Sequence, residues 1–169
     1  IWLIPYDANK VIRADPSSGT LTGYSTFASG VGSFARYRSA IVTDNGAYVF
    51  MIGATSSHIA YLRTSDAFMW GYSAWPAGFP GFSVYAFGGA AYDRTRVWTG
   101  PRDLSWVIGL RTSDGQMVGF DSSTWGGGIS YYSSNKCHCV LSTAEGTLYI
   151  IPGKGSHIVR LNTVSGAVI

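Results

Sequence analysis

The chain repeats one pattern of hydrophobic and polar positions four times. Apolar segments that begin at Val11, Ile59 and Val107 are spaced by 48 residues, and a fourth begins at Ile158, 51 residues after the third. Each segment leads into a short turn rich in Ser, Thr, Asp and Gly, and then into a second apolar segment. Apolar runs on either side of such turn residues predict β-hairpins. A repeat of this length built only from strands favours the blade of a β-propeller.

Two further strands are predicted before each hairpin. A dense apolar run precedes it in all four copies, at Ile1–Pro5, Val49–Gly53, Val97–Pro101 and Leu148–Pro152. Three copies have another strand before that run, at Ser39–Asp44, Phe87–Asp93 and Cys137–Thr143. One unit therefore contains strand A, a tight turn, strand B, a longer loop, strand C, a tight turn and strand D, in an antiparallel meander.

Strand B is apolar on both faces, which suits the middle strand of a blade packed between two neighbours. This favours a propeller over an immunoglobulin-like sandwich or a single barrel. We expect one all-β domain over residues 1–169, with blade units at approximately 1–27, 28–75, 76–125 and 126–169, or about 3.5–4 blades. Unit one has no strand A and unit four lacks the end of strand D. We therefore expect an arc of a larger ring, completed by further chain or by a partner; the alternatives are a nearly complete four-bladed ring and another all-β solenoid or sandwich.

Composition narrows the class of protein. Charged residues make up 12% of the chain, against about 25% in ordinary soluble domains, and Glu145 is the one glutamate, which argues against a helical protein. The net charge of +3 is spread without a basic run, so no nucleic-acid partner is expected. No stretch approaches the 18 apolar residues of a membrane span. The chain begins with Ile1 rather than Met, which suggests a processed product or a piece of something longer.

The long loops predict where a ligand binds. In a four-stranded meander the B–C and D–A connections emerge at one rim, and the tight A–B and C–D turns emerge at the other. Because binding residues concentrate on varied loops held by a rigid scaffold, the loop-rich rim is the predicted binding surface. Its candidates are Tyr6, Asp7, Asn9, Lys10, His58, Arg102, Asp103, Trp106, Lys154 and His157. The alternative is that these are solvated loop residues.

Other polar and aromatic residues are assigned structural roles. The aspartates of the turns, which are Asp15, Asp44, Asp66, Asp93 and Asp114, are expected to accept hydrogen bonds from backbone N–H groups. Arg63 and Arg111, again 48 residues apart, are expected to bind backbone carbonyls or turn carboxylates. The aromatics of the D–A loops, which are Phe34, Tyr37, Phe82 and Tyr85, are expected to plug the space between blades.

The two cysteines and the carboxylates give little support to catalysis. Cys137 and Cys139 flank His138, and regular strand alternation would place both cysteines on one face. We expect two small buried side chains, with a strained disulfide or a thiol site as alternatives. One such cluster is half of a metal site, so no metal or cofactor is expected. No G-x-S-x-G elbow or H-E-x-x-H motif is present, and the carboxylate pair Asp7 and Asp103 falls two blades apart.

The first unit also resembles a known repeat. Ile1–Tyr24 is similar to the blade of the streptogramin (virginiamycin B) lyase-like, NHL and YncE-like propellers, which reads roughly IWFTxxxxNxIgRIDPxTGxI. The matching residues are Ile1, Trp2, Asn9, Val11, Ile12, Arg13, Asp15, Pro16, Gly19 and Leu21. Unit four matches at Tyr149, Ile158, Arg160, Asn162 and Gly166, and units two and three match poorly. The resemblance implies the propeller fold. It does not carry over the lyase's catalytic histidine and glutamate, because no residue here occupies an assignable motif.

These observations predict a non-catalytic binding or scaffold module that engages a glycan or a protein partner through the loop-rich rim. The resemblance extends to repeats of large surface proteins similar to adhesins, which implies an extracellular or cell-surface setting. One alternative is a propeller enzyme of lyase or hydrolase type with a deep pocket near the ring axis. Another is a structural repeat that self-associates, because the bare edge of unit one invites strand addition.

Overall fold

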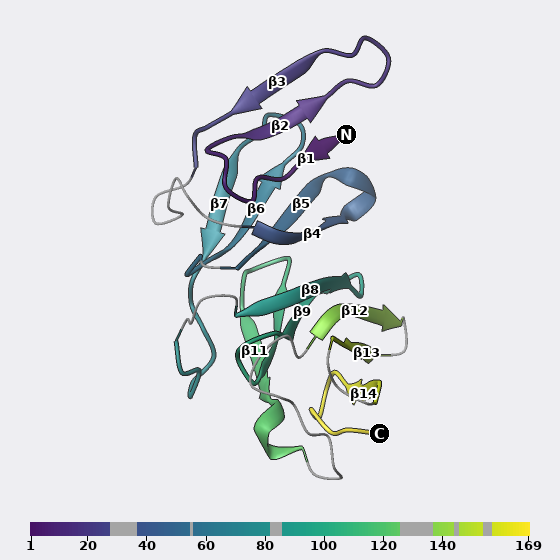
Figure 1. Ribbon diagram of the computed structural model, residues 1–169. Helices are drawn as coiled ribbons and strands as arrows, with labels where there is room; N and C mark the ends of the chain where they lie inside the picture. The colour runs from purple at the N-terminus through teal and green to yellow at the C-terminus, as the bar shows by residue number, and fades with distance from the viewer. Residues whose placement is uncertain (28–36, 55, 82–85, 126–136, 144–145, 154–156) are drawn as a thin grey trace.

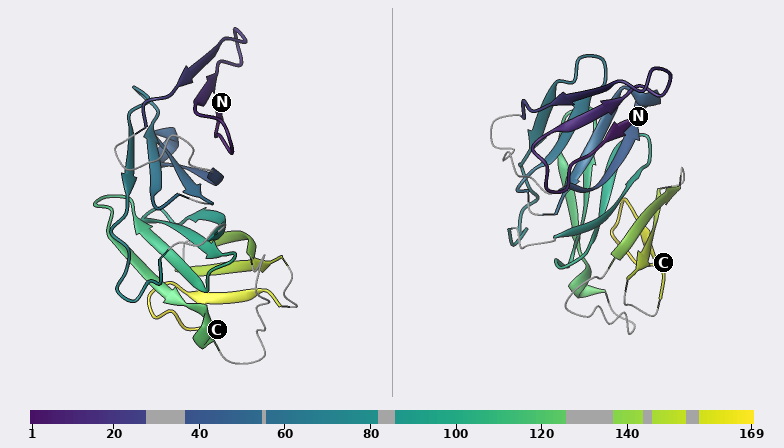
Figure 2. Two further views of the ribbon diagram at one scale, coloured as in Figure 1. Left: turned by 60° about the vertical axis from the view of Figure 1, so that its left-hand side comes forward. Right: turned by 45° about the horizontal axis from the view of Figure 1, so that its top comes forward.

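The computed structural model describes residues 1–27, 37–54, 56–81, 86–125, 137–143, 146–153 and 157–169. Its strands form four antiparallel sheets, which stack face to face in a fan (Figures 1 and 2). Two short 3-10 turns, η1 (Asp44–Gly46) and η2 (Ser122–Thr124), are the helical segments among the described residues.

Each sheet is a meander of consecutive strands, as the repeat predicts. Blade one contains β1 (Trp2–Leu3), β2 (Val11–Ala14) and β3 (Leu21–Tyr24). Blade two contains β4 (Tyr37–Thr43), β5 (Tyr48–Gly53), β6 (Ile59–Arg63) and β7 (Met69–Tyr72). Blade three contains β8 (Phe87–Tyr92), β9 (Arg96–Pro101), β10 (Trp106–Arg111) and β11 (Met117–Asp121). Blade four contains β12 (Cys137–Thr143), β13 (Thr147–Pro152) and β14 (Val159–Asn162), with one further bridge between Leu161 and Val168.

The four blades form an arc of a β-propeller. The inner strands β4, β8 and β12 contact one another in turn, as strands A do around a propeller axis. Blades one and four lie at opposite ends of the fan, and the two termini lie there with them (Figures 1 and 2). The expected arc is therefore confirmed, and the four blades do not close into a small ring.

Apolar side chains between neighbouring blades make up the core. We call the face of a blade that packs on the preceding blade its front face, and the opposite face its back face. The front face of blade two presents Val49, Met51, Ala60, Leu62 and Met69 to the back face of blade one. The corresponding front-face residues are Val97, Ile108, Leu110 and Met117 in blade three, and Leu148, Ile150, Val159 and Leu161 in blade four. Each fully buried aliphatic side chain stabilises the fold by about 1.5–3 kcal/mol, so these interfaces hold the arc together.

The middle strands B are the most buried, as their sequence predicts. Every residue of β5 after Tyr48 and every residue of β9 after Arg96 is buried, and Trp98 is completely inaccessible. A sheet covered on both faces needs apolar side chains on both, which explains why these strands show no alternation.

The two end faces of the arc remain exposed and apolar. On the front face of blade one, Ile1 is 69% exposed and Leu21 is 65% exposed. On the back face of blade four, Leu141 is 55% exposed and Ile158 is 62% exposed. No blade among the described residues covers either face.

The cysteine strand departs from the expected regularity. The pairing of β12 with β13 shifts register between Cys137 and Cys139, so the alternation that would place both on one face does not hold there. The Cys137 thiol is buried against Gly100, as expected for a core position. The side chains of His138 and Cys139 lie outside the described residues.

Candidate functional site

The loop-rich rim carries the predicted binding residues on four separate blades. Tyr6, Asp7, Asn9 and Lys10 of blade one and His157 of blade four are exposed, whereas His58 of blade two and Arg102, Asp103 and Trp106 of blade three are half-buried. Lys154 lies outside the described residues. The order of strands within each sheet assigns the B–C loops to the same rim as the D–A connections.

Trp106 is held by packing at this rim. Its ring meets Phe79 edge-on with centroids 5.8 Å apart, and it lies across Gly119, where a Cβ atom would come within 2.8 Å of the ring. Phe79 in turn stacks on Trp75 at 4.9 Å, and both rings lie over Phe87. These D–A aromatics fill the space between blades two and three.

The remaining predicted plugs are only partly described. Tyr37 is buried between blades one and two, in agreement with the plug interpretation. Phe34, Phe82 and Tyr85 lie outside the described residues.

The B–C loop of blade two is fixed by local hydrogen bonds. The Trp75 indole N–H donates to the Ser57 carbonyl at 3.1 Å, which ties the D–A segment to this loop. The backbone N–H of His58 donates to Ser56 Oγ at 3.2 Å, and Nδ1 of the His58 ring lies 2.9 Å from Ser57 Oγ. The His58 ring is therefore held half-buried beside the loop.

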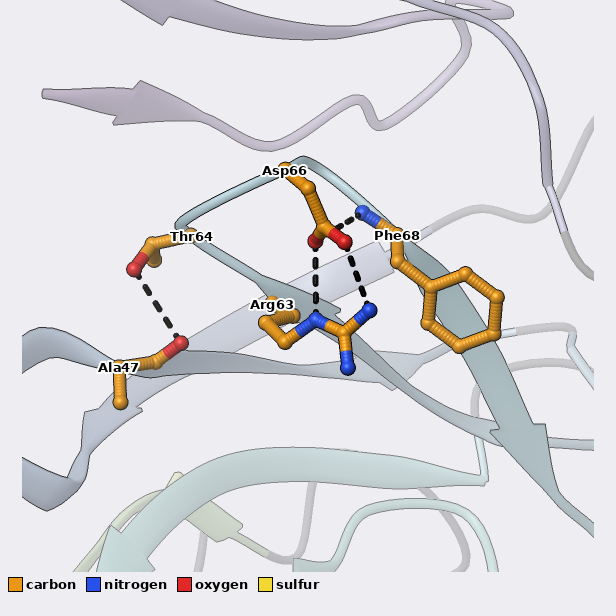
Figure 3. A network of polar contacts seen from close by, with 5 residues as sticks. All are labelled: Ala47, Arg63, Thr64, Asp66 and Phe68. Atoms are coloured by element: carbon orange, nitrogen blue, oxygen red, sulfur yellow. Dashed lines mark hydrogen bonds and ion pairs between the residues drawn. The ribbon is translucent and has the colours of Figure 1, made fainter.

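The opposite rim is built from tight turns with paired charges, as Figure 3 shows for blade two. Asp66 accepts hydrogen bonds from Nε and Nη2 of Arg63 at 2.9 and 2.6 Å and from the Phe68 N–H at 3.1 Å. Hydrogen bonds from Arg63 and then from the Phe68 N–H lower the pKa of Asp66 from 3.8 to about 2. Arg111 and Asp114 repeat this pair in blade three. Of the two roles expected for Arg63 and Arg111, binding a turn carboxylate is the one observed, and the carboxylate lies in the same turn.

Asp44 is the exception among the turn aspartates. Asp15, Asp66, Asp93 and Asp114 each accept a backbone N–H of their own turn, as predicted. The carboxylate of Asp44 instead accepts the Tyr92 hydroxyl of the next blade at 2.6 Å, so the prediction of local capping is wrong here. Asp44 and Asn45 both have positive φ angles, of 51° and 54°, so the backbone of this turn is left-handed at two successive residues.

An aromatic cleft lies beside Asp44, between blades two and three at the turn rim. The cavity measures about 430 Å³ and is lined by Asp44, Tyr48, Phe50, Tyr61, Tyr72, Thr112 and Ser113. Tyr61 stacks on Tyr72 at 5.7 Å and meets Tyr48 edge-on at 5.6 Å. The sequence interpretation missed this cleft because it searched only the long loops for ligand contacts.

A second cavity, of about 540 Å³, lies between blades one and two. Its lining includes Tyr24, Phe27, Phe68 and Trp70, from the outer strands and their neighbouring turns. Phe27 directly precedes residues that the structure does not describe.

The described residues contain neither a metal-binding cluster nor a membrane-spanning helix. No group of three or more His, Cys, Asp or Glu side chains there is arranged to hold a metal ion. The same part of the chain contains no helix long and apolar enough to cross a membrane.

The blades, their meander order and their inner strands define the chain as part of a β-propeller protein. Streptogramin B lyase is similar, with a TM-score of 0.68 at 18% sequence identity over 99% of this chain and 49% of that one. The WD40 repeats of RRP9 give a TM-score of 0.65 at 10% identity over 96% of this chain and 44% of that one. Hydrazine synthase of Kuenenia stuttgartiensis gives a TM-score of 0.65 at 14% identity over 95% of this chain and 42% of that one.

At these identities the likeness shows the fold alone, and it confirms the blade resemblance found in the sequence. The chain spans about half the length of each of these three structures. No family model and no curated protein matches the sequence.

Proposed function

We propose that the chain is a non-catalytic binding module that engages a glycan or a protein partner through its loop-rich rim. The main observation in its support is a contrast within the chain. The blades are regular and joined by continuous apolar interfaces, whereas the B–C loops differ in residue type from blade to blade. A rigid scaffold that presents variable loops is the usual arrangement of a recognition surface.

The exposed side chains of blade one support this proposal. Tyr6 offers an aromatic face with 39% of its surface exposed, and Asp7 and Lys10 beside it are exposed charges. Such a combination of stacking and hydrogen-bonding groups suits a polar ligand.

Catalysis is not proposed, because the acidic residues of this rim are too widely separated. Asp7 belongs to blade one and Asp103 to blade three, with blade two between them. Sheets pack about 10 Å apart, so two blades place these loops on the order of 20 Å apart. Paired carboxylates in glycoside hydrolysis work at about 5–9.5 Å. The likeness to streptogramin B lyase carries no activity to this chain.

A glycan array and a protein-binding screen test the rim. A variant with Tyr6, Asp7, Arg102 and Trp106 changed to Ala should lose the binding shown by the wild type. Because Trp106 packs against Phe79, its loss also perturbs the interface, so Tyr6→Ala/Asp7→Ala is the decisive variant. It changes exposed side chains only and should weaken binding at least tenfold with an unaltered thermal unfolding temperature. Undiminished binding by both variants contradicts the proposal.

A second candidate function is self-assembly, which the exposed apolar end faces favour. The front face of blade one has the same residue pattern that blades two and three bury against a preceding blade. A back face of another copy of this repeat would cover it in the same way. Contiguous exposed apolar surface of this kind marks interaction sites.

A further inference from the structure

The aromatic cleft between blades two and three differs from the corresponding groove between blades three and four. Repeat spacing makes Phe50 equivalent to Trp98, Tyr61 to Gly109, and Tyr72 to Phe120, each pair 48 residues apart. In both blades the first of these positions pairs directly with the second across the sheet, at Phe50–Tyr61 and at Trp98–Gly109. The two grooves therefore occupy equivalent places at successive blade interfaces.

Trp98 fills the groove between blades three and four. Its indole lies over Gly109, where a Cβ atom would come within 2.4 Å of the ring, and it stacks on Phe120 at 6.1 Å. The indole N–H donates to Asp93 at 2.6 Å. Asp93, the first residue after strand A, also accepts the N–H groups of Thr95 and Arg96. The carboxylate is thus satisfied, and the space is occupied by a ring that carries a donor.

Between blades two and three the Tyr61 ring stacks on Tyr72, as Trp98 stacks on Phe120 in the next groove. Neither Phe50 nor Tyr61 donates a hydrogen bond to Asp44, as the Trp98 indole does to Asp93. The cavity of about 430 Å³ beside these rings falls in the size range of small-molecule sites. Asp44, the first residue after strand A in this blade, accepts only the Tyr92 hydroxyl among the described residues. One carboxylate oxygen is therefore left for another donor.

The remaining lining is rich in hydroxyl groups and aromatic surface. Among the described residues, the hydroxyls of Tyr48, Tyr61 and Tyr72 make no hydrogen bond with the protein. Thr112 and Ser113 add two more hydroxyls from the facing turn of blade three, and that of Thr112 already donates to the Thr95 carbonyl at 3.3 Å. Asp114, next to them, is already paired with Arg111, so the cleft has little net charge beyond Asp44.

We propose that this cleft binds one neutral sugar ring. The C–H face of the sugar packs on the half-buried tyrosine rings that line the cavity. One sugar hydroxyl donates to the open oxygen of Asp44, another donates to the Thr112 hydroxyl, and others exchange hydrogen bonds with the tyrosine hydroxyls. A flat heteroaromatic ligand would leave most of these hydroxyls unused, and an organic cation would meet a single carboxylate.

The site is distinct from the loop-rich rim, and its test can be separated from the test of the rim. The probes are the methyl glycosides of glucose, galactose, mannose and N-acetylglucosamine. Indole represents a flat heteroaromatic ligand and tetramethylammonium an organic cation, and both are tested as competitors. Binding to the 169-residue chain is measured by NMR, with dissociation constants on the order of 1 mM expected for a single ring.

Three variants define the expected result. Asp44→Asn should weaken binding of the preferred glycoside about tenfold, because a charge-assisted hydrogen bond is lost. Phe50→Trp/Tyr61→Gly copies the filled groove of blades three and four and should abolish binding. Tyr72→Phe removes one hydroxyl and should weaken binding, whereas Tyr24→Phe, at the equivalent position of blade one, should have no effect.

Several results would overturn the proposal. These are the absence of binding by all four glycosides, binding of indole or tetramethylammonium in their place, and unchanged binding by both Asp44→Asn and Tyr72→Phe in folded protein. Tyr6→Ala/Asp7→Ala at the loop-rich rim should leave glycoside binding to the cleft intact. A loss of binding in that variant alone would assign the sugar site to the rim instead.

Discussion

At the scale of single residues, the turn carboxylates divide into those that stabilise their own turn and one that links two blades. Asp66 and Asp114 bind an arginine three residues earlier and a backbone N–H two residues later. Asp44 reaches the Tyr92 hydroxyl in the neighbouring sheet. The residue type is the same, and the backbone of the turn decides which partner the carboxylate meets.

The pair of Arg63 and Asp66 gives a prediction for pH. Hydrogen bonds from Arg63 and the Phe68 N–H lower the pKa of Asp66 to about 2 in the folded chain, against 3.8 unperturbed. A lowered folded pKa stabilises the fold above pH 3.8, and this contribution disappears as the pH falls toward 2. An NMR titration of Arg63→Met should show the pKa of Asp66 rising toward 3.8.

Arg111→Met is the matched control for this titration. It removes the equivalent arginine of blade three, so the pKa of Asp66 should stay at about 2. A value of about 2 for Asp66 in Arg63→Met would mean that the Phe68 N–H, and not the arginine, sets it.

At the scale of elements, the C–D turn of one blade packs on the aromatic ring of the blade before it. Tyr72 rests on Gly115, and Phe120 rests on Gly166 in the same way. Both glycines have positive φ, 75° and 73°, so each position combines a left-handed backbone with a close ring contact.

Substitution of these glycines should separate the two effects. Gly19 of blade one has a φ of 71° but no atom within 4 Å of a Cβ, so Gly19→Ala should cost about 1–2 kcal/mol for the backbone alone. In Gly115→Ala the Cβ would come within 2.2 Å of the Tyr72 ring, which should add about 1–3 kcal/mol of overpacking. Urea unfolding measures both losses. Equal losses would show that the ring moves aside without cost.

The elements were predictable from the sequence to within about two residues, because apolar runs and turn residues alternate at a fixed period. The predicted strand Cys137–Thr143 agrees with β12, and Ser39–Asp44 differs from β4 (Tyr37–Thr43) only at its ends. The register shift in β12 could not be predicted from the sequence, because an extra residue in a strand does not change the composition of the strand.

The cleft was not predicted, although the sequence contains the difference that distinguishes it from the next groove. The exchange of Trp98 and Gly109 for Phe50 and Tyr61 is visible in the aligned repeats. Its meaning depends on knowing that these positions face each other across two strands, which requires the sheet register. The residues of the loop-rich rim stay a prediction.

At the scale of the whole molecule, each end of the arc has an apolar sheet face that no blade among the described residues covers. The apolar side chains at least half exposed there are Ile1, Leu3 and Leu21 at one end and Leu141, Ile158 and Ile169 at the other. Every interior face of the same kind is covered by a neighbouring blade.

The 169-residue chain in solution should therefore associate through these faces. Light scattering should show a mass that rises with concentration, and Leu3→Asp/Leu21→Asp should lower it to that of one chain, because a carboxylate would have to be buried in the contact. Val164→Asp, at an 88% exposed turn position away from both faces, should leave association unchanged. A wild-type mass of one chain at every concentration contradicts the assembly proposal.

The way blades meet also has a consequence for how such a chain can change length. Every junction joins the back face of one blade to the front face of the next. The residues at the junction of blades two and three lie 48 positions after their equivalents at the junction of blades one and two. An in-frame duplication or loss of one 48-residue repeat period, such as residues 49–96, keeps a back face beside a front face at the new junction. Unequal recombination between copies would thus yield longer or shorter arcs that still fold, whereas an insertion of half a unit would set two unlike surfaces together.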